Sequence, residues 1–257
     1  KLTVMDKWLL SKLNSMVKTV DDNLANYRIP EAAKALQEFT DEMSNWYVRR
    51  GRERYWVQGE TDDKTAAYMT LYTALTVTAK TAAPMIPFMA EAIYRNLVCN
   101  VDKSAPESVH LCDFPVIRED LIDKELEKNM DEVVDIVVLG RAARNGSNLK
   151  NRQPLNTMYV NCDKKVEGYF IDIIREELNV KNVEFVPRED AFENQKEQFG
   201  DKAALLEGLS AEILPDAYKV VVDDLSMFDS TVKEIKKFKD YFPELNELDT
   251  PKTKKEK

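Results

Sequence analysis

Apolar residues recur at helical spacing from the N-terminus to Pro154, and this periodicity restricts the fold more than any other feature of the chain. The clearest run lies near the N-terminus and consists of Leu9, Leu13, Met16, Val20 and Leu24. Such a run places apolar side chains on one face of a helix and polar residues on the other. Glycine and proline are scarce, at 7 and 10 of 257 residues, so the chain is predicted to be mainly α.

The same periodicity predicts five helices, over residues 6–26, 30–46, 62–82, 87–97 and 119–148. The second helix is expected to continue past Trp46 into the arginines that follow. The third helix is expected to contain Tyr68, Leu71, Leu75, Thr78 and Ala82 at helical spacing. Residues 100–118 are expected to form a loop with a short extended piece at Val109–Leu111. Helices connected in this way predict a helical bundle.

The pattern changes after Pro154, where short apolar runs alternate with helical ones. Strands are expected at residues 157–161, 183–186 and 218–222, and helices at residues 166–178, 201–214 and 230–241. This alternation indicates a small mixed α/β unit. We therefore predict a helical bundle over residues 1–154, a small α/β domain over residues 155–250 and a disordered cationic tail over residues 251–257.

Composition narrows the classes of function. The apolar share is 44%, and no apolar run approaches the ~20 residues of a membrane span, so no membrane partner is expected. Cys99, Cys112 and Cys162 are odd in number and far apart, which argues against a zinc ribbon and favours a reducing, cytoplasmic setting. Because His110 is the only histidine and no glycine-rich phosphate loop occurs, no catalytic residue, metal or cofactor is predicted here. The chain starts without a methionine, and we expect it to be part of a longer protein.

The first cationic cluster, residues 45–56, reads Asn-Trp-Tyr-Val-Arg-Arg-Gly-Arg-Glu-Arg-Tyr-Trp in a chain whose net charge is −9. Its cationic members are Arg49, Arg50, Arg52 and Arg54. Guanidinium groups bind phosphate oxygens through paired hydrogen bonds, which favours contact with RNA. The alternative is that Arg50 and Arg54 pair with acidic side chains of neighbouring helices. Tyr55 and Trp56 are candidates for stacking on bases, and packing in the core is the other interpretation of both.

The second cationic cluster lies within Gly140–Leu155 and consists of Arg141, Arg144, Lys150 and Arg152. No acidic residue in that stretch offsets the four charges. Cations near the C-terminus of a helix interact favourably with its dipole, which explains two of them without any ligand. RNA stems are held largely through phosphate and 2′-hydroxyl contacts, and two cationic patches on rigid helices suit that task.

Several segments together resemble one family. They are Met5–Asn14, Ser44–Trp56, Ala83–Glu91, Ser108–Leu111, Gly140–Arg144 and Asn151–Leu155. In order and spacing they are similar to the anticodon-binding region of isoleucyl-tRNA synthetases, which are class I aminoacyl-tRNA synthetases. The segment with the arginines and aromatic rings is more specific than Ala83–Phe88, because synthetases for valine and leucine carry segments similar to the latter. The resemblance covers residues 1–186, and residues 187–257 match no continuation of the family.

The resemblance implies a helical bundle that binds the anticodon side of the tRNA for isoleucine. It also implies a parent enzyme that uses ATP and Mg²⁺ to attach isoleucine to that tRNA and that edits misattached valine. The catalytic domain of the same full-length chain is then a second partner. The His-x-Gly-His and Lys-Met-Ser-Lys-Ser signatures of the family are missing here, as is the four-cysteine zinc module of some members. This part alone should therefore be inactive.

Both cationic clusters are predicted to bind RNA and to converge on one outward-facing surface. The predicted RNA-binding residues are Arg49, Arg50, Arg52, Arg54, Tyr55, Trp56, Arg141, Arg144, Lys150 and Arg152. Two alternatives remain. One is the equivalent domain of a valine or leucine enzyme, and the other is a helical protein-docking module without RNA binding.

Overall fold

The computed structural model describes residues 1–161, 166, 168–186 and 218–221. The chain divides into two compact units, Lys1–Lys128 and Asn129–Lys257. The helices expected at residues 201–214 and 230–241 and the tail at residues 251–257 lie outside the described residues. The domain boundary near residue 155 stays a prediction. The division between the two compact units falls within a helix.

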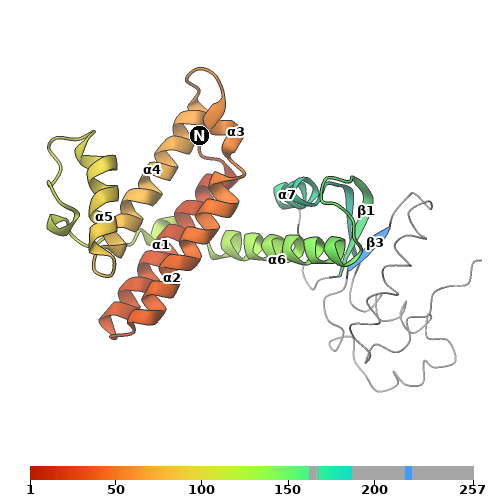
Figure 1. Ribbon diagram of the computed structural model, residues 1–257, viewed down its shortest axis with the longest axis horizontal. Helices are drawn as coiled ribbons and strands as arrows, with labels where there is room; N and C mark the ends of the chain where they lie inside the picture. Colours follow the sequence, from red (N-terminus) through yellow and green to blue (C-terminus); the bar gives the residue numbers. More distant parts are fainter. Residues whose placement is uncertain (162–165, 167, 187–217, 222–257) are drawn as a thin grey trace, which may run out of the picture. The chain divides into compact units, whose positions relative to one another are not determined.

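The first unit is a helical bundle, and the prediction of a mainly α fold is confirmed. Its elements are α1 (Val4–Ala25), α2 (Ile29–Glu42), η1 (Met43–Val48), α3 (Arg52–Trp56), α4 (Asp62–Ala82), α5 (Pro87–Tyr94), η2 (Arg95–Cys99), η3 (Val109–Leu111) and η4 (Glu119–Leu121). A long helix, α6 (Lys124–Gly146), begins in this unit and continues in the next. Figure 1 shows α1 and α2 as an antiparallel hairpin, with α4 beside α1 and α5 against α4.

The first helix supplies much of the core of this unit. A capping box starts it: the Thr3 hydroxyl accepts a hydrogen bond from the Asp6 backbone N–H (3.2 Å), and the Asp6 carboxylate accepts one from the Thr3 N–H (2.8 Å). Of the predicted stripe, Leu9, Leu13, Met16 and Val20 are buried and Leu24 is half buried. Trp8 is buried beside them. The periodicity of this segment therefore predicted its buried face correctly.

The buried face of α4 contains only one of the five residues that the periodicity picked out in this helix, Ala82. The buried positions of the helix include Ala67, Thr70 and Ala74, whereas the ring of Tyr68 is half exposed. Small side chains let helix backbones approach closely, so α4 places its small residues in the bundle and directs larger ones outward. The helix is capped by the Thr61 hydroxyl, which accepts a hydrogen bond from the Lys64 N–H (3.1 Å).

Two short elements also differ from the prediction. The helix that starts at α2 does not run unbroken through the arginines, because η1 is a turn of π-helix and a turn then leads to α3. A π-helix bonds residue i to i+5, so the 3.6-residue period no longer predicts which residues lie on one face. The piece expected to be extended at Val109–Leu111 is a 3₁₀-helix, held because Glu91 accepts hydrogen bonds from the Ser108 hydroxyl and the Val109 N–H (2.9 Å each).

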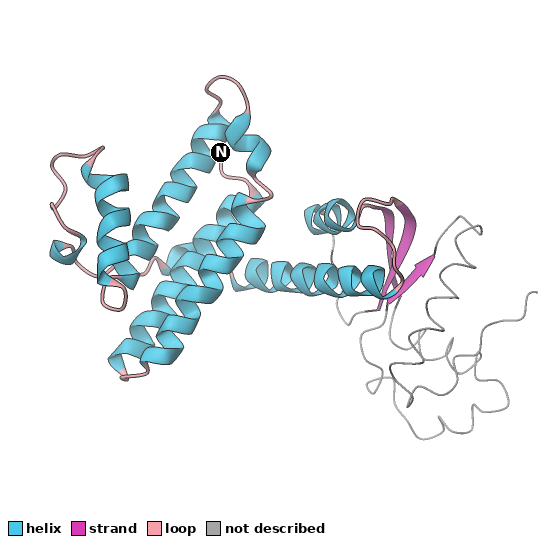
Figure 2. Cartoon of the chain, viewed as in Figure 1, coloured by secondary structure: helices cyan, strands magenta, loops and turns pink. Residues whose placement is uncertain are grey.

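The second unit is a small α/β assembly. Its described elements after α6 are β1 (Leu155–Asn161), α7 (Tyr169–Leu178), β2 (Val180–Val186) and β3 (Tyr218–Val221). The strand order is β2-β1-β3, with β1 parallel to β2 and antiparallel to β3. Figure 2 shows the strands in magenta with α7 alongside them. The strands predicted in this region and the helix between the first two are confirmed, with shifts of a few residues at their ends.

The C-terminal part of α6 packs closely within the second unit. A stripe of buried residues runs along it, at Met130, Val133, Val137, Gly140 and Arg144. A Cβ atom on Gly140 would lie 2.5 Å from Leu178 Cδ1 of α7 and 3.1 Å from Met158 Cε of β1. Glycine therefore permits the close approach of α6 to both elements.

Candidate nucleic-acid interface

Arg54, from the first cationic cluster, bridges two helices of the bundle. Its Nη1 and Nη2 donate to the two carboxylate oxygens of Asp6 at 2.8 and 3.0 Å. Its Nε and Nη2 donate to the carboxylate of Asp63 at 2.9 and 2.8 Å. Asp6 lies in the first turn of α1 and Asp63 in the first turn of α4. The alternative in which Arg54 pairs with acidic side chains of neighbouring helices is therefore confirmed.

Asp6 is fully buried and is the centre of this contact. Besides Arg54 and the Thr3 N–H, its carboxylate accepts a hydrogen bond from the Tyr47 hydroxyl (2.6 Å). Burial alone raises the pKa of Asp6, but the hydrogen bonds from Arg54, Tyr47 and Thr3 outweigh burial and lower the pKa from 3.8 to about 2. Burial and the adjacent carboxylate raise the pKa of Tyr47, so its hydroxyl remains a donor. Asp6 is therefore charged at neutral pH and holds three segments together.

The remaining members of the first cluster fall into an inward and an outward group. Tyr55 is half buried, with its ring edge-on to Tyr68 at a centroid distance of 5.2 Å. Trp56 is 73% exposed, and the Arg52 guanidinium lies over its ring, 5.3 Å from the centroid. Arg52 itself is exposed. The structure thus separates Tyr55, which packs on the bundle, from Trp56, which faces solvent.

The backbone of the cluster is fixed by one glycine. The Gly51 N–H donates to the Tyr47 carbonyl oxygen (2.9 Å), and a Cβ atom at residue 51 would lie only 2.8 Å from that oxygen. The turn from η1 into α3 therefore requires glycine. On either side of this turn, Arg49 is exposed and Arg50 is half buried.

Arg144, from the second cationic cluster, is 1% exposed and has a structural position. Its Nη1 donates to the carbonyl oxygens of Lys150 (3.0 Å) and Gln153 (2.9 Å). Its Nη2 donates to the carbonyl oxygens of Leu178 and Asn179, at the C-terminus of α7. A guanidinium there satisfies the last carbonyls of the helix and complements its dipole. Arg144 is buried beyond the reach of RNA, and the expectation that it contacts RNA is corrected to a role in positioning.

The loop at residues 147–154 presents two other cations of this cluster, Lys150 and Arg152. Its carbonyl groups turn inward, since Arg144 binds two of them and the Asn179 amide donates to the Arg152 carbonyl oxygen (2.9 Å). The side chains of Lys150 and Arg152 are exposed. Arg141, half buried, forms an ion pair with Glu177 of α7. The inward contacts of the backbone therefore hold Lys150 and Arg152 at the surface.

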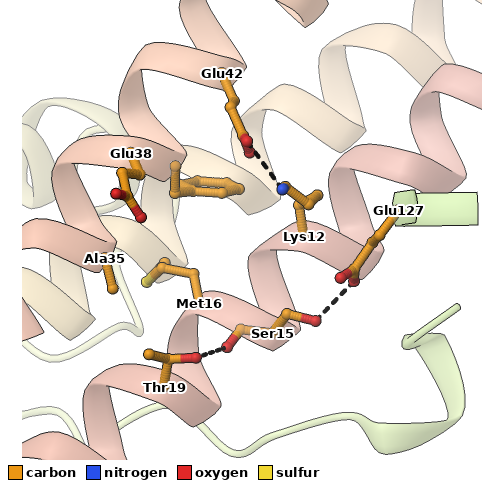
Figure 3. Close-up of a pocket in the computed structure, with 9 residues that line it drawn as sticks. Lys12, Ser15, Met16, Thr19, Ala35, Glu38, Glu42 and Glu127 are labelled. Carbon is orange, nitrogen blue, oxygen red and sulfur yellow. Dashed lines mark hydrogen bonds and ion pairs between the residues drawn. The ribbon is translucent and has the colours of Figure 1, made fainter. Parts of the chain in front are cut away.

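A polar pocket in the first unit offers little room for a ligand. Its volume is about 160 Å³, and its lining, drawn in Figure 3, includes Lys12, Ser15, Glu38, Glu42 and Glu127. Lys12 pairs with Glu42 (2.9 Å), and the Ser15 hydroxyl donates to Glu127 (2.7 Å). Small-molecule sites are usually ~300 Å³ or larger and mostly apolar. The pocket is better explained as the polar seam where α1 meets α2 and the first turn of α6.

Two kinds of site are absent from the part of the chain that the structure describes. Among those residues, no group of three or more histidine, cysteine or acidic side chains is placed to hold a metal ion. None of the described helices is long and apolar enough to cross a membrane.

Two features of the clusters could have been recognised in the sequence. Thr3 and Asp6 have the spacing of a capping box, which marks Asp6 as a residue with a structural partner. Arg144 continues the buried stripe of α6 at the next helical position after Gly140. A cation in line with a buried stripe is a structural residue more often than a ligand-binding one, because its neighbours are buried on that face.

A family model described as anticodon-binding domain of tRNA ligase matches residues 6–159. The chain therefore belongs to the family of anticodon-binding domains of tRNA ligases. A second family model, described as FtsX extracellular domain, matches residues 170–240, most of which lie outside the described residues.

The curated proteins to which the chain is similar include isoleucine–tRNA ligases from several organisms. One from Clostridium novyi is 59% identical over 182 residues, which are 71% of this chain and 17% of that protein. One from Methanothrix thermoacetophila is 40% identical over 184 residues, 71% of this chain and 18% of that protein. One from Dehalococcoides mccartyi is 39% identical over 222 residues, 82% of this chain and 22% of that protein. The resemblance to isoleucyl-tRNA synthetases is confirmed, and the chain spans less than a quarter of the length of these relatives.

Proposed function

We propose that this chain is the part of an isoleucine–tRNA ligase that binds the anticodon side of the tRNA for isoleucine. The observation that carries the proposal is the identity of 59% to an isoleucine–tRNA ligase within a match to the anticodon-binding family. In the parent, a catalytic domain elsewhere in the same chain attaches isoleucine with ATP and Mg²⁺, in the cytoplasm. The present part contributes binding of RNA and no catalytic residue.

Apart from Arg54 and Arg144, the predicted cations form two surfaces, in which Arg50 and Arg141 are half buried and the other four are exposed. The first cationic surface consists of Arg49, Arg50 and Arg52, and the second consists of Arg141, Lys150 and Arg152. Each is mounted on backbone that internal contacts fix: Gly51 and Arg54 for the first, Arg144 for the second. A backbone that is already fixed loses less conformational freedom when its cations neutralise phosphates. Arg54 and Arg144 support these surfaces from inside.

The second surface gives the sharper test, because Lys150 and Arg152 are both exposed. We expect Lys150→Ala with Arg152→Ala to weaken binding of the tRNA and to reduce the slope of log affinity against log salt by about 2. The matched control is Lys34→Ala with Lys103→Ala, which removes two exposed cations outside both surfaces. Fluorescence anisotropy of labelled tRNA across a salt series measures both variants. An equal loss in the two pairs would mean that net charge alone, and not this surface, governs affinity.

The choice of tRNA is a separate test. The purified tRNAs for isoleucine, valine and leucine are allowed to compete for binding to the chain. The isoleucine tRNA should bind best, because the matched relatives are named isoleucine–tRNA ligases. Preference for a valine or leucine tRNA would assign the chain to the related enzyme. Absence of tRNA binding at low salt would overturn the proposal and favour a protein-docking role.

A further inference from the structure

We propose that Trp56 is a stacking platform for one unpaired base of the bound RNA. The inference rests on the proposed function and adds to it the kind of RNA structure that the first cationic surface recognises. All three tryptophans of the chain lie among the described residues. Trp8 and Trp46 are 1% and 9% exposed, whereas Trp56 is 73% exposed. An indole is too large and too apolar to be left in water without a cost.

Trp56 is held at a fixed place by its neighbours in α3. Arg54 binds Asp6 and Asp63, and the Tyr55 ring packs edge-on against Tyr68. These two residues attach α3 to the bundle, although the helix has only five residues. Trp56 follows directly, so the anchored helix carries its ring at a defined position on the surface.

Arg52 prepares the ring for a base. It precedes Trp56 by four residues, which places both side chains on one face of the helix. Its guanidinium lies 5.3 Å from the centre of the Trp56 ring, a cation–π contact that restrains both side chains before RNA arrives. A base stacks on the part of the ring that Arg52 leaves open, and the positive charge beside it is available to a phosphate of the same strand.

The chemistry of this surface favours an unpaired base over a duplex. Bases inside a duplex are stacked on one another and present only their edges. An exposed tryptophan ring therefore finds no free base face on which to stack. An unpaired base offers both faces, and every base has a face that an aromatic ring accepts. Arg52, an exposed cation, lies directly over the platform. A purely apolar peptide would gain nothing from this charge.

The native tryptophan fluorescence reports this contact directly, because Trp56 is the exposed one of three. The probes are a stem-loop RNA with an unpaired loop and a blunt duplex of the same stem. We expect the stem-loop to quench the fluorescence of the full chain in a saturable way, and the duplex to quench it far less. In Trp56→Phe, which keeps an aromatic ring, binding of the stem-loop should persist while the quenching disappears.

Affinity gives an independent measurement by anisotropy of labelled RNA. Trp56→Ala should lose about tenfold in affinity for the stem-loop and little for the duplex. Phe88→Ala is the matched control, because Phe88 is also an exposed aromatic residue but belongs to α5. Thermal unfolding of each variant checks that the fold is intact. Stem-loop binding with no quenching and no loss in Trp56→Ala would overturn the stacking proposal while RNA binding stands. If the unmodified chain does not bind RNA at all, the proposed function is overturned instead.

Discussion

Arg54 and Arg144 each hold elements of one unit together, yet their charges are compensated in different ways. Arg54 binds two carboxylates, Asp6 and Asp63, which come from different helices. Among the described residues, Arg144 binds only backbone carbonyl oxygens, at the end of α7 and in the loop before β1. Arg54 forms ion pairs with carboxylates, which lose their charge in acid. Arg144 caps a helix through carbonyl oxygens, which do not titrate. The stability of the two units should therefore respond differently to substitution and to pH.

Removal of the Arg144 guanidinium should have the largest effect. Arg144→Met removes a donor from four carbonyl oxygens, of which those of Lys150 and Asn179 keep a backbone N–H donor and those of Gln153 and Leu178 lose the Arg144 bond without such a replacement. We expect about 4 kcal/mol less stability in the second unit. Arg144→Lys should recover only part of this loss, because one ammonium cannot reach all four oxygens. Hydrogen exchange of peptides from α7 and β1, followed by mass spectrometry, measures the effect within this unit. Equal protection in Arg144→Met and the unmodified chain would contradict the cap.

Removal of the Arg54 guanidinium should cost somewhat less, about 3 kcal/mol in the first unit, because it leaves the buried Asp6 without its ion pair. Asp6 keeps its hydrogen bonds from Tyr47 and Thr3, which limits the loss. In the double variant Arg54→Met with Asp6→Asn, no buried charge is left unpaired. We therefore expect the double variant to be less destabilised than the sum of the single ones. Exact additivity in chemical denaturation of all three would mean that the two side chains are not coupled.

Acid should weaken the ion pair of Arg54 and leave the carbonyl contacts of Arg144 unaffected. The pKa of Asp6 is lowered to about 2 in the folded chain, against 3.8 in the unfolded one, so its contribution is present above pH ~4 and is lost as pH falls toward 2. The shift corresponds to about 2 kcal/mol. Glu127, whose pKa is also lowered by hydrogen bonds from Lys124, Ser11 and Ser15 despite its burial, adds to the same trend. Denaturation between pH 5 and pH 2.5 should show a shallower loss in Asp6→Asn than in the unmodified chain.

The sequence predicted the elements of both units better than it predicted the roles of their arginines. Periodicity was enough for α1, because Leu9 and Leu13 lie on a regular helix with large side chains inward. The periodicity was misleading in α4, where Ala67 and Ala74 face the core. Close packing there requires small residues, and alanine contributes little to a hydropathy pattern. Long-range pairs such as Arg54 with Asp6 depend on how the helices pack. Local spacing in the sequence does not predict this packing.

The same limit applies to the candidate interface. Tyr55 and Trp56 are adjacent in the sequence and received the same prediction, but the bundle covers one ring and leaves the other exposed. Arg144 and Lys150 were likewise grouped by charge, although one is buried beneath the loop that carries the other. Charge clustering therefore located the region, and only tertiary contacts divided its members into supporting and exposed residues.

The smallest effect is expected where α1 and α7 end. Each helix is followed by a residue in the left-handed conformation, Tyr27 (φ 58°) after α1 and Asn179 (φ 51°) after α7. Asparagine adopts this conformation readily, and the Asn179 amide donates to the Arg152 carbonyl oxygen. Tyrosine is unfavourable there, and the Tyr27 ring is almost fully exposed, so no burial offsets the strain.

Glycine should therefore have opposite effects at the two helix ends. We expect Tyr27→Gly to stabilise the first unit by about 0.5 kcal/mol, the relief of strain being partly offset by the freedom glycine gains in the unfolded chain. Asn179→Gly should destabilise the second unit slightly, because it removes the contact with the loop. Paired thermal unfolding of the two variants measures the difference. A loss of stability in Tyr27→Gly would show that the tyrosine ring makes a contribution to folding that outweighs its backbone strain.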